Sequence, residues 1–443
     1  MIKNKNIKND VNCMNKWLKV GVILFAIHFS LFTSPVAAQT LTDEYEEIDT
    51  LFVPIEDEIS VLDKQGNEEL IEFPEAMTYN LDSLLSLYMS KNYLSMPGDC
   101  QMKDENPVFT PEEYIERLRR MPTIMEMGYN DIVQRFIDRY MGRLRHSVSF
   151  MLGAANFYVP IFEEALEAYQ VPLELKYLPV IESALNPKAV SRVGATGLWQ
   201  FMLGTGKQYG LEINSLVDER RDPVRASYAA ARYLRDLYRI FGDWNLVIAA
   251  YNCGPGNINK AIHRANGEKD YWKLYPYLPA ETRGYVPAFI AANYAMTYYC
   301  EHGICPMSTR LPLQTDTIVV VRDVHLEQIA GVLDLDIEML RSLNPQYRRD
   351  IVPGTTKEYA IRLPMADTGR FIDMQDSIYN YRASELLTKR AIVEVNDDQP
   401  TYRKKVVKRG RRTSVRSSRN ARRGKASRSR TTKKSTSRKR RRR

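Results

Sequence analysis

One carboxylate stands among apolar residues in the most informative part of this chain, residues 177–202. Glu182 is the only acidic residue there, and its neighbours Val180 and Ile181 are apolar. Apolar surroundings raise the pKa of a carboxyl towards neutrality, and a carboxyl that is still protonated there can donate a proton to a leaving-group oxygen. The pattern allows a general acid, but by itself it favours a carboxylate at the surface end of a helix.

Acid-catalysed cleavage of a glycosidic bond usually needs a second carboxylate as nucleophile or base. Asp222 precedes Pro223 and is better explained as the cap of a helix. Asp218 and Glu219 are interpreted as part of a charged turn, and Glu281 as a structural hydrogen-bond acceptor. The sequence places none of them opposite Glu182, so the substrate itself would have to resolve the intermediate.

The elements that must position these residues are helical. Apolar residues recur at spacings of three and four from Pro111 onward, which predicts amphipathic helices. One predicted helix begins near Pro172 and ends near Glu182, and small residues with Gln200 then open another. Further helices are expected over 223–241, 244–251 and 281–300, and no alternating strand pattern occurs between 111 and 305. The sequence predicts a mainly α fold.

Four motifs follow one another in this helical region. They are Glu182-Ser183-Ala184-Leu185-Asn186-Pro187 with Ser191, then Gly194-Ala195-Thr196-Gly197-Leu198-Trp199-Gln200, then Ala249-Ala250-Tyr251-Asn252-Cys253-Gly254-Pro255-Gly256, and Leu278-Pro279-Ala280-Glu281-Thr282-Arg283-Gly284-Tyr285-Val286-Pro287. In this order they resemble the motifs of family 1 lytic transglycosylases, and most closely the membrane-bound lytic murein transglycosylase D group.

The resemblance implies a goose-lysozyme-like helical domain that cleaves peptidoglycan without water and without cofactor or metal. Glu182 would protonate the oxygen between N-acetylmuramic acid and N-acetylglucosamine. The N-acetyl group of the substrate would stabilise the charged centre, and Glu182 would then accept the proton of the muramyl C6 hydroxyl. The product would carry a 1,6-anhydromuramyl end. One group that acts first as acid and then as base needs a pKa near the working pH.

The remaining site residues are assigned by the same resemblance. Ser191 and Gln200 would orient sugar groups, and Tyr251 would lie near the acid and assist the charged centre. Asn252 and Tyr285 would shape the groove. The plain alternatives are a turn hydroxyl for Ser191, a helix cap for Asn252 and a core aromatic for Tyr285.

A second unit follows the helical region. A strand at 317–321, two helices, an Asn344-Pro345 turn and a strand at 359–364 give a βααβ order over 315–366. This resembles the peptidoglycan-binding LysM module, but Arg322-Asp323-Val324-His325 replaces the usual first turn. The loop that helps to contact sugar in that family is therefore altered, so the resemblance predicts the fold of this unit without predicting that it binds sugar.

The two ends of the chain differ from the middle. A basic start, an apolar run over 20–32 and Val36-Ala37-Ala38 predict a cleaved signal peptide over 1–38. Residues 39–110 are expected to form an acidic, partly disordered arm, 111–310 the catalytic domain and 367–400 a linker. Residues 401–443 hold 22 Lys or Arg and no acid, so the rest of the chain has 41 basic against 54 acidic residues.

That basic tail is expected to be disordered and could bind anionic polymers of the envelope. With a signal peptide, a nucleic-acid partner is not expected, and we expect the chain in the periplasm, with attachment to the outer membrane left open. Cys300 and Cys305 could close a small loop, and Cys253 is expected to be a free, buried thiol. Three alternatives to the lytic transglycosylase remain: a hydrolytic lysozyme on the same fold, a non-catalytic scaffold that binds the cell wall, and a polyanion-binding protein built around the basic tail.

Overall fold

The computed structural model describes residues 59–62, 68–78, 94–95, 102, 105–309, 311–312, 314–388 and 391–395. The predicted signal peptide, a helix expected near 81–89 and the basic tail lie outside these residues. Two units are described below: the helical domain, residues 105–309, and the C-terminal module, residues 314–388.

The helical domain contains ten α-helices within the described residues. They are α3 (Pro111–Arg120), α4 (Asp131–Met141), α5 (Arg145–Ala168), α6 (Leu178–Ser183), α7 (Leu203–Gln208), α8 (Pro223–Phe241), α9 (Trp244–Cys253), α10 (Pro255–Arg264), α11 (Tyr271–Leu274) and α12 (Ala280–Tyr298). Two 3₁₀ segments, η2 (Leu173–Tyr177) and η3 (Tyr275–Tyr277), precede α6 and α12. Local signals explain several starts: Thr110, Asn130 and Asp243 each accept a hydrogen bond from a backbone N–H of the helix that follows.

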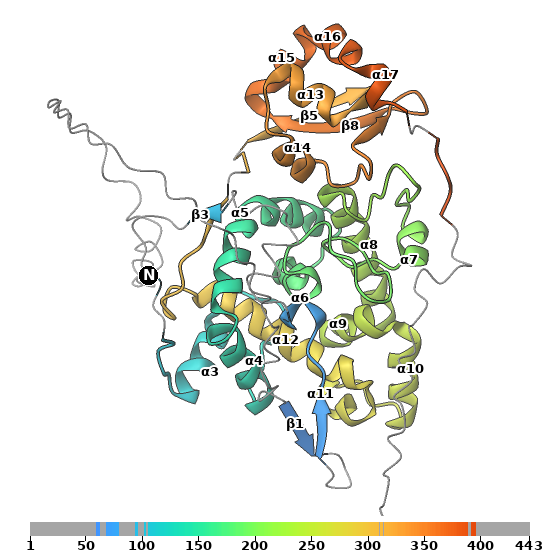
Figure 1. Ribbon diagram of the computed structural model, residues 1–443. Helices are drawn as coiled ribbons and strands as arrows, with labels where there is room; N and C mark the ends of the chain where they lie inside the picture. Colours follow the sequence, from blue (N-terminus) through green and yellow to red (C-terminus); the bar gives the residue numbers. More distant parts are fainter. Residues whose placement is uncertain are drawn as a thin grey trace, which may run out of the picture. The chain divides into compact units, whose positions relative to one another are not determined.

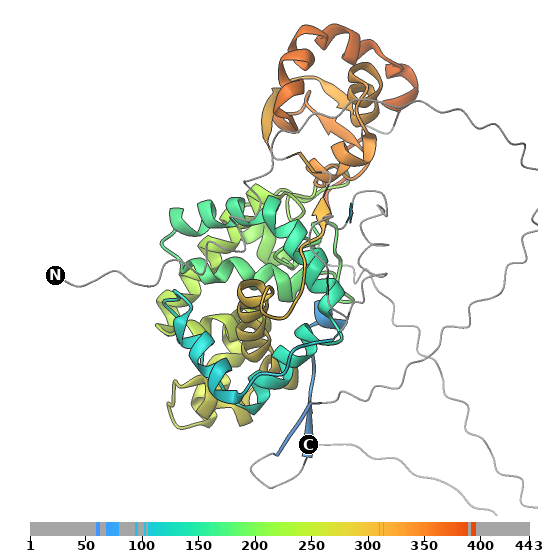
Figure 2. The same ribbon diagram turned by 90° about the vertical axis from the view of Figure 1, so that its left-hand side faces the viewer.

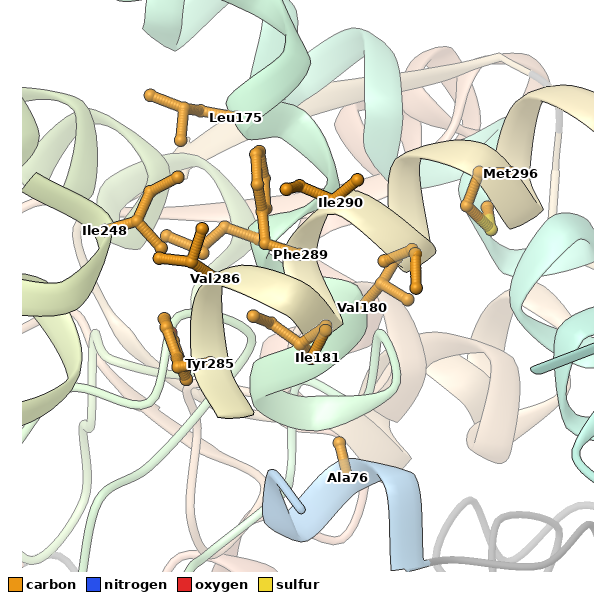
Figure 3. Packing of buried hydrophobic residues seen from close by; sticks show 14 of the residues in the cluster. Ala76, Leu175, Val180, Ile181, Ile248, Tyr285, Val286, Phe289, Ile290 and Met296 are labelled. Atoms are coloured by element: carbon orange, nitrogen blue, oxygen red, sulfur yellow. The ribbon is translucent and has the colours of Figure 1, made fainter. Parts of the chain in front are cut away.

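The gold helix α12 lies among the other helices of this domain and packs against α4, α5, α6 and α9 (Figures 1 and 2). It is apolar on nearly all sides: Val286, Phe289 and Ile290 are at most 2% exposed. Val180 and Ile181 of α6 are equally buried and lie beside α12 (Figure 3). Burying each such side chain contributes roughly 1.5–3 kcal/mol, so this packing fixes α6 on α12.

The C-terminal module has a small core of its own. Strands β5 (Thr315–Val320) and β8 (Tyr359–Pro364) pair antiparallel, as do β6 (Asp323–His325) and β7 (Ile351–Pro353). Helices α13 (Leu326–Leu333) and α14 (Ile337–Leu343) lie between these strands in sequence. The expected fold class, a mainly α-helical domain followed by a small α+β module, is confirmed.

The expectation of a linker over 367–400 is corrected by the structure. Helices α15 (Met365–Asp373), α16 (Gln375–Asn380) and α17 (Ala383–Leu386) occupy part of it, and Phe371 and Ile378 are fully buried in the core of the C-terminal module. Apolar residues in a short polar segment gave too weak a periodic signal to predict this. Within the described residues, 367–388 are part of the module and not a connection beyond it.

Part of the acidic arm also belongs to a folded core. Strands β1 (Ile59–Leu62) and β2 (Glu68–Ile71) pair with each other, the 3₁₀ turn η1 (Glu75–Thr78) follows, and β3 (Leu94–Ser95) pairs with β4 (Ser308–Thr309). Ile71 and Met77 are buried in the core of the helical domain. Charge dominates the composition of the arm, whereas these few apolar residues decide where it packs.

The described cysteines are of two kinds. Cys300 and Cys305 are both disulfide-bonded, while Cys253 is a free, half-buried thiol. Burial raises the pKa of the Cys253 thiol, which keeps it protonated and unreactive. Across the described residues, no helix combines the length and the apolar character that a membrane span requires.

Candidate active site

Glu182 lies in the last turn of α6, where the chain reverses sharply. The helix ends at Ser183, and the next two residues, Ala184 and Leu185, have φ values of 49° and 61°. Left-handed conformations of this kind cost about 1–2 kcal/mol each for residues with a Cβ. The buried apolar side chains of both residues hold the turn in place. Strained backbone that the surrounding packing enforces is common at functional sites.

The carboxyl of Glu182 is held in a mostly protonated state at neutral pH. Burial raises its pKa from 4.5 to about 8; the hydroxyl of Tyr285 donates a hydrogen bond to Oε1 and opposes that rise, and the nearby Glu281 adds to it. The side chain keeps part of its surface open to solvent. Glu182 therefore combines access to solvent with the proton affinity that a general acid needs at neutral pH.

Tyr285 is the closest functional partner of Glu182 in the described structure. It comes from the second turn of α12, and its ring is 2% exposed. Burial raises its pKa well above the usual value, and the negative charge of Glu182 adds to that rise. The phenol therefore remains a hydrogen-bond donor. The sequence suggested only that Tyr285 shapes a groove or belongs to the core, and no local signal revealed the direct bond.

Tyr251 also lies near Glu182 and near the second motif. Burial raises its pKa well above the usual value, and the charge of Glu182 raises it further. Its hydroxyl donates to the carbonyl oxygen of Trp199 over 2.7 Å. The Tyr251 side chain thus joins the end of α9 to the residue before Gln200, next to the acid.

Trp199 is an anchor for this second motif. Its indole is fully buried, packs edge-on against Phe162 and donates from Nε1 to the hydroxyl of Ser227 over 2.9 Å. Ser183, directly after the acid, donates to the carbonyl of Leu198 over 2.9 Å. The turn that follows the acid and the second motif are therefore tied together by short polar contacts that the sequence did not reveal.

Ser191 and Gln200 lie in one loop, residues 189–201. The hydroxyl of Ser191 accepts from the N–H of Ala195 over 3.0 Å, as expected for a turn hydroxyl. Gln200 has a φ of 47°, and its amide donates to the carbonyl of Gly197 over 2.8 Å. Both side chains support the 189–201 loop, and their contact with sugar stays a prediction.

Asn252 connects the ends of two helices. Thr282 donates to its Oδ1 over 2.8 Å, and its Nδ2 donates to Glu281 over 3.3 Å. Gly254, and not Asn252, follows α9 as the capping residue. Glu281 is exposed and accepts a hydrogen bond as expected, but its effect on Glu182 was not foreseen.

Two acidic residues that were expected in a charged turn lie in such a turn and are also buried. Asp218 is 1% exposed and Glu219 is 8% exposed. Asp218 pairs with Arg220, which is equally buried. The charged turn is present as expected, and its burial, which depends on segments far away in the sequence, was not foreseen. Asp222 caps α8 as expected, accepting from the N–H groups of Val224 and Arg225.

Comparison with known proteins identifies two domain types in this chain. The family model for the transglycosylase SLT domain matches residues 160–274, and this chain contains such a domain. The model for the LysM-like domain of lytic transglycosylase MltD matches residues 314–380, so the C-terminal module is of that type. The resemblance that the four motifs indicated is confirmed.

Individual relatives that are similar to this chain are named as lytic murein transglycosylases. The membrane-bound lytic murein transglycosylase D of Escherichia coli K12 is 32% identical over 200 residues, which are 43% of this chain and 43% of that protein. The soluble lytic murein transglycosylase of the same strain is 35% identical over 124 residues, 27% of this chain and 19% of that protein. The chain thus spans less than half the length of these relatives.

A solved structure is also similar, that of the 70 kDa soluble lytic transglycosylase of Escherichia coli. It is 31% identical, with 32% of this chain and 24% of that one covered, at a TM-score of 0.28. Its overlap is too small to place any residue of the site.

Proposed function

We propose that this chain is a lytic transglycosylase that cleaves the β-1,4 bond between N-acetylmuramic acid and N-acetylglucosamine in peptidoglycan. The observation that carries the proposal is the state of Glu182, a carboxyl with a pKa of about 8 beside the Tyr285 hydroxyl, within an SLT domain. Such a group can serve as acid and then as base near neutral pH.

In the first step Glu182 donates its proton to the glycosidic oxygen, and the bond from that oxygen to C1 of the muramyl sugar breaks. The N-acetyl oxygen of the same sugar stabilises the positive charge at C1. In the second step the Glu182 carboxylate accepts the proton of the C6 hydroxyl, whose oxygen bonds to C1. The result is a 1,6-anhydromuramyl end; no water is consumed, and Glu182 is protonated again.

The surrounding tyrosines support the charged form that appears between these steps. When Glu182 has lost its proton, the Tyr285 hydroxyl donates to the carboxylate, and a hydrogen bond to a charged group is worth about 1.5–3 kcal/mol. Tyr251 is near enough for the charge of Glu182 to raise its pKa, so it stays protonated, and its hydroxyl donates to the carbonyl of Trp199. Ser191 and Gln200 would bind the sugar from the 189–201 loop. Asn252 would shape the groove near Glu281.

The test is mass spectrometry of purified peptidoglycan digested by the chain from Gln39 onward, beside a Glu182→Gln control. We expect anhydromuramyl ends from the native chain and none from the control. Cleavage by Glu182→Gln at the native rate would contradict the assignment of the acid. Binding of glycan without cleavage by the native chain would favour the scaffold.

A hydrolytic lysozyme is the second candidate, and the position of Glu281 favours it. This exposed carboxylate is close enough to Glu182 to raise its pKa, so it could activate water. Digestion in ¹⁸O-labelled water separates the two reactions. Reducing ends that carry ¹⁸O, and that disappear in Glu281→Gln, would identify a hydrolase; anhydro ends from both chains support the transglycosylase.

The location of the enzyme is part of the proposal. A signal peptide cleaved after Ala38 would deliver the chain to the periplasm, where its substrate lies. N-terminal sequencing of the mature chain tests this, and a mature chain that still begins before Gln39 would contradict it. We also propose that the basic residues of 401–443 bind anionic envelope polymers.

A further inference from the structure

A buried ion pair links the 189–201 loop to the C-terminal module. The guanidinium of Arg220 binds both carboxylate oxygens of Asp218, with Nε to Oδ1 at 2.9 Å and Nη2 to Oδ2 at 2.8 Å. The remaining nitrogen, Nη1, donates to the carbonyl oxygens of Gly194 at 3.2 Å and Phe201 at 3.3 Å. One buried cation therefore holds two points of the loop that carries Ser191 and Gln200.

The backbone of the same segment fits tightly under this loop. Gly197 has a φ of +88°, and a Cβ added there would lie 1.8 Å from the carbonyl oxygen of Arg220. The carbonyl of Phe201 also accepts from the N–H of Thr196 over 3.1 Å, which closes the loop on itself. The loop thus rests on Arg220 through both its backbone and its side chain.

Asp218 is in turn held by the C-terminal module. Its N–H donates to the carbonyl of Gln346 over 2.9 Å, and its neighbour Val217 forms a β-bridge with Tyr347. Leu216 and Val217 are fully buried within the core cluster of the module. Asp218 therefore ends a stretch of the helical domain that completes the hydrophobic core of the module.

The turn that carries these residues is a small hairpin, residues 212–219. Its two sides are joined by a bridge between Ile213 and Asp218 and by the bond from the N–H of Asn214 to the carbonyl of Val217 over 2.7 Å. Glu212 at its start accepts from the hydroxyl of Tyr359 over 2.7 Å and pairs with Lys357. The module thus contacts the hairpin along its whole length.

We propose that Asp218 and Arg220 are positioning residues for the 189–201 loop, and that the C-terminal module sets their position by its contacts with the 212–219 hairpin. In this arrangement the module affects substrate binding through the 212–219 hairpin and the 189–201 loop, whether or not it binds sugar itself. The inference rests on the proposed function for its effect on cleavage, but its effect on the loop can be measured without it.

The test uses the double variant Asp218→Asn/Arg220→Met. Replacing both partners avoids an uncompensated buried charge, and such replacements often leave the fold intact. The N–H of residue 218 remains, so the bond to Gln346 is kept. The matched control is Asp367→Asn/Arg370→Met, which removes an ion pair within the module. Thermal unfolding of both variants shows that each is folded.

The first readout is hydrogen exchange of the peptide that covers 189–201. We expect about tenfold faster exchange in the Asp218/Arg220 variant, because two hydrogen bonds from a charged donor are lost. Exchange in α12 and in the control variant is expected to stay at the native rate. Native exchange of the loop in a folded Asp218/Arg220 variant would overturn the proposal, whatever the chain catalyses.

The second readout separates a positioning role from a general loss of structure. On soluble glycan strands we expect KM to rise about tenfold with kcat nearly unchanged, because a contact made in both ground and transition states is weakened. The alkaline limb of the pH profile, which reports Glu182, is expected to stay in place. An unchanged KM, or a shifted limb, would overturn the role in positioning. If the native chain forms no anhydro ends, the proposed function fails while the exchange experiment still decides the inference.

Val217→Ala tests whether the C-terminal module sets the position of Asp218 and Arg220. It loosens the contact between the hairpin and the core of the module and leaves the Asp218–Arg220 pair in place. We expect faster exchange of 189–201 and a higher KM, both smaller than in the double variant and not additive with it. Native values in Val217→Ala, or full additivity, would contradict transmission from the module through the ion pair.

Discussion

Replacing Tyr285 by phenylalanine removes a hydroxyl that donates to the Glu182 carboxylate, while the ring that packs in the helical core stays. A hydrogen bond to a charged group is worth about 1.5–3 kcal/mol, and one pKa unit corresponds to about 1.4 kcal/mol. The loss therefore raises the pKa of Glu182 by roughly one to two units above its value of about 8.

The sign of the effect on activity follows from the role of the acid. Glu182 must be protonated to start the reaction, so kcat/KM falls as pH rises through its pKa. In Tyr285→Phe this fall is expected at pH 9 or above, about one unit or more higher than in the native chain. The plateau below it is expected to drop about ten- to hundredfold, because the carboxylate formed in the first step loses its donor.

The assay is the release of anhydromuropeptides from purified glycan between pH 5 and pH 10. Tyr294→Phe is the matched control, since Tyr294 lies on the same helix and its hydroxyl contacts Arg117 and His302 instead. The control is expected to keep the native pH profile. An alkaline limb that stays in place in Tyr285→Phe, or moves to lower pH, would refute the assignment of this hydrogen bond to the charged form.

Three further predictions concern stability and the ends of the chain. Because the pKa of Glu182 is raised from 4.5 to about 8, the free energy of unfolding falls by up to about 5 kcal/mol as pH rises through that window. In urea unfolding at pH 8, Glu182→Gln should therefore be more stable than the native chain by a few kcal/mol. At pH 4 we expect no such gain. Gly197→Ala should lower the free energy of unfolding by more than about 4 kcal/mol, because its Cβ would meet the Arg220 carbonyl. Gly210→Ala, with φ +82° and open space around it, should lower it by about 1–2 kcal/mol. Equal losses of unfolding free energy in denaturant would contradict this reading. A chain that ends at residue 400 should cleave purified glycan at the native rate but lose salt-dependent binding to polyanions, and loss of cleavage would assign the tail a catalytic part.

Helices with strong local signals were predictable from sequence. Thr110 begins α3 with a full capping box, and Asp222 before Pro223 begins α8, because a cap depends on residues within one turn. The arm and the expected linker were predicted less well. Met77 and Phe371 are isolated apolar residues in polar segments, and only the cores that receive them show their role.

The sequence by itself determined which residue we propose as the acid, because Glu182 is the only carboxylate in 177–202 and stands at the start of four ordered motifs. The order of the helices, and in the module the two outer strands with the two helices between them, also follow from local periodicity and turn residues, whereas the short strands β6 and β7 were not predicted. The tertiary structure decided the pKa and the hydrogen-bond partner of Glu182. Tyr285 reaches Glu182 across 103 residues of chain, and Asp218 and Arg220 are buried by segments on both sides of them. Desolvation and hydrogen bonding depend on neighbours in space, and no local pattern of residues contains that information.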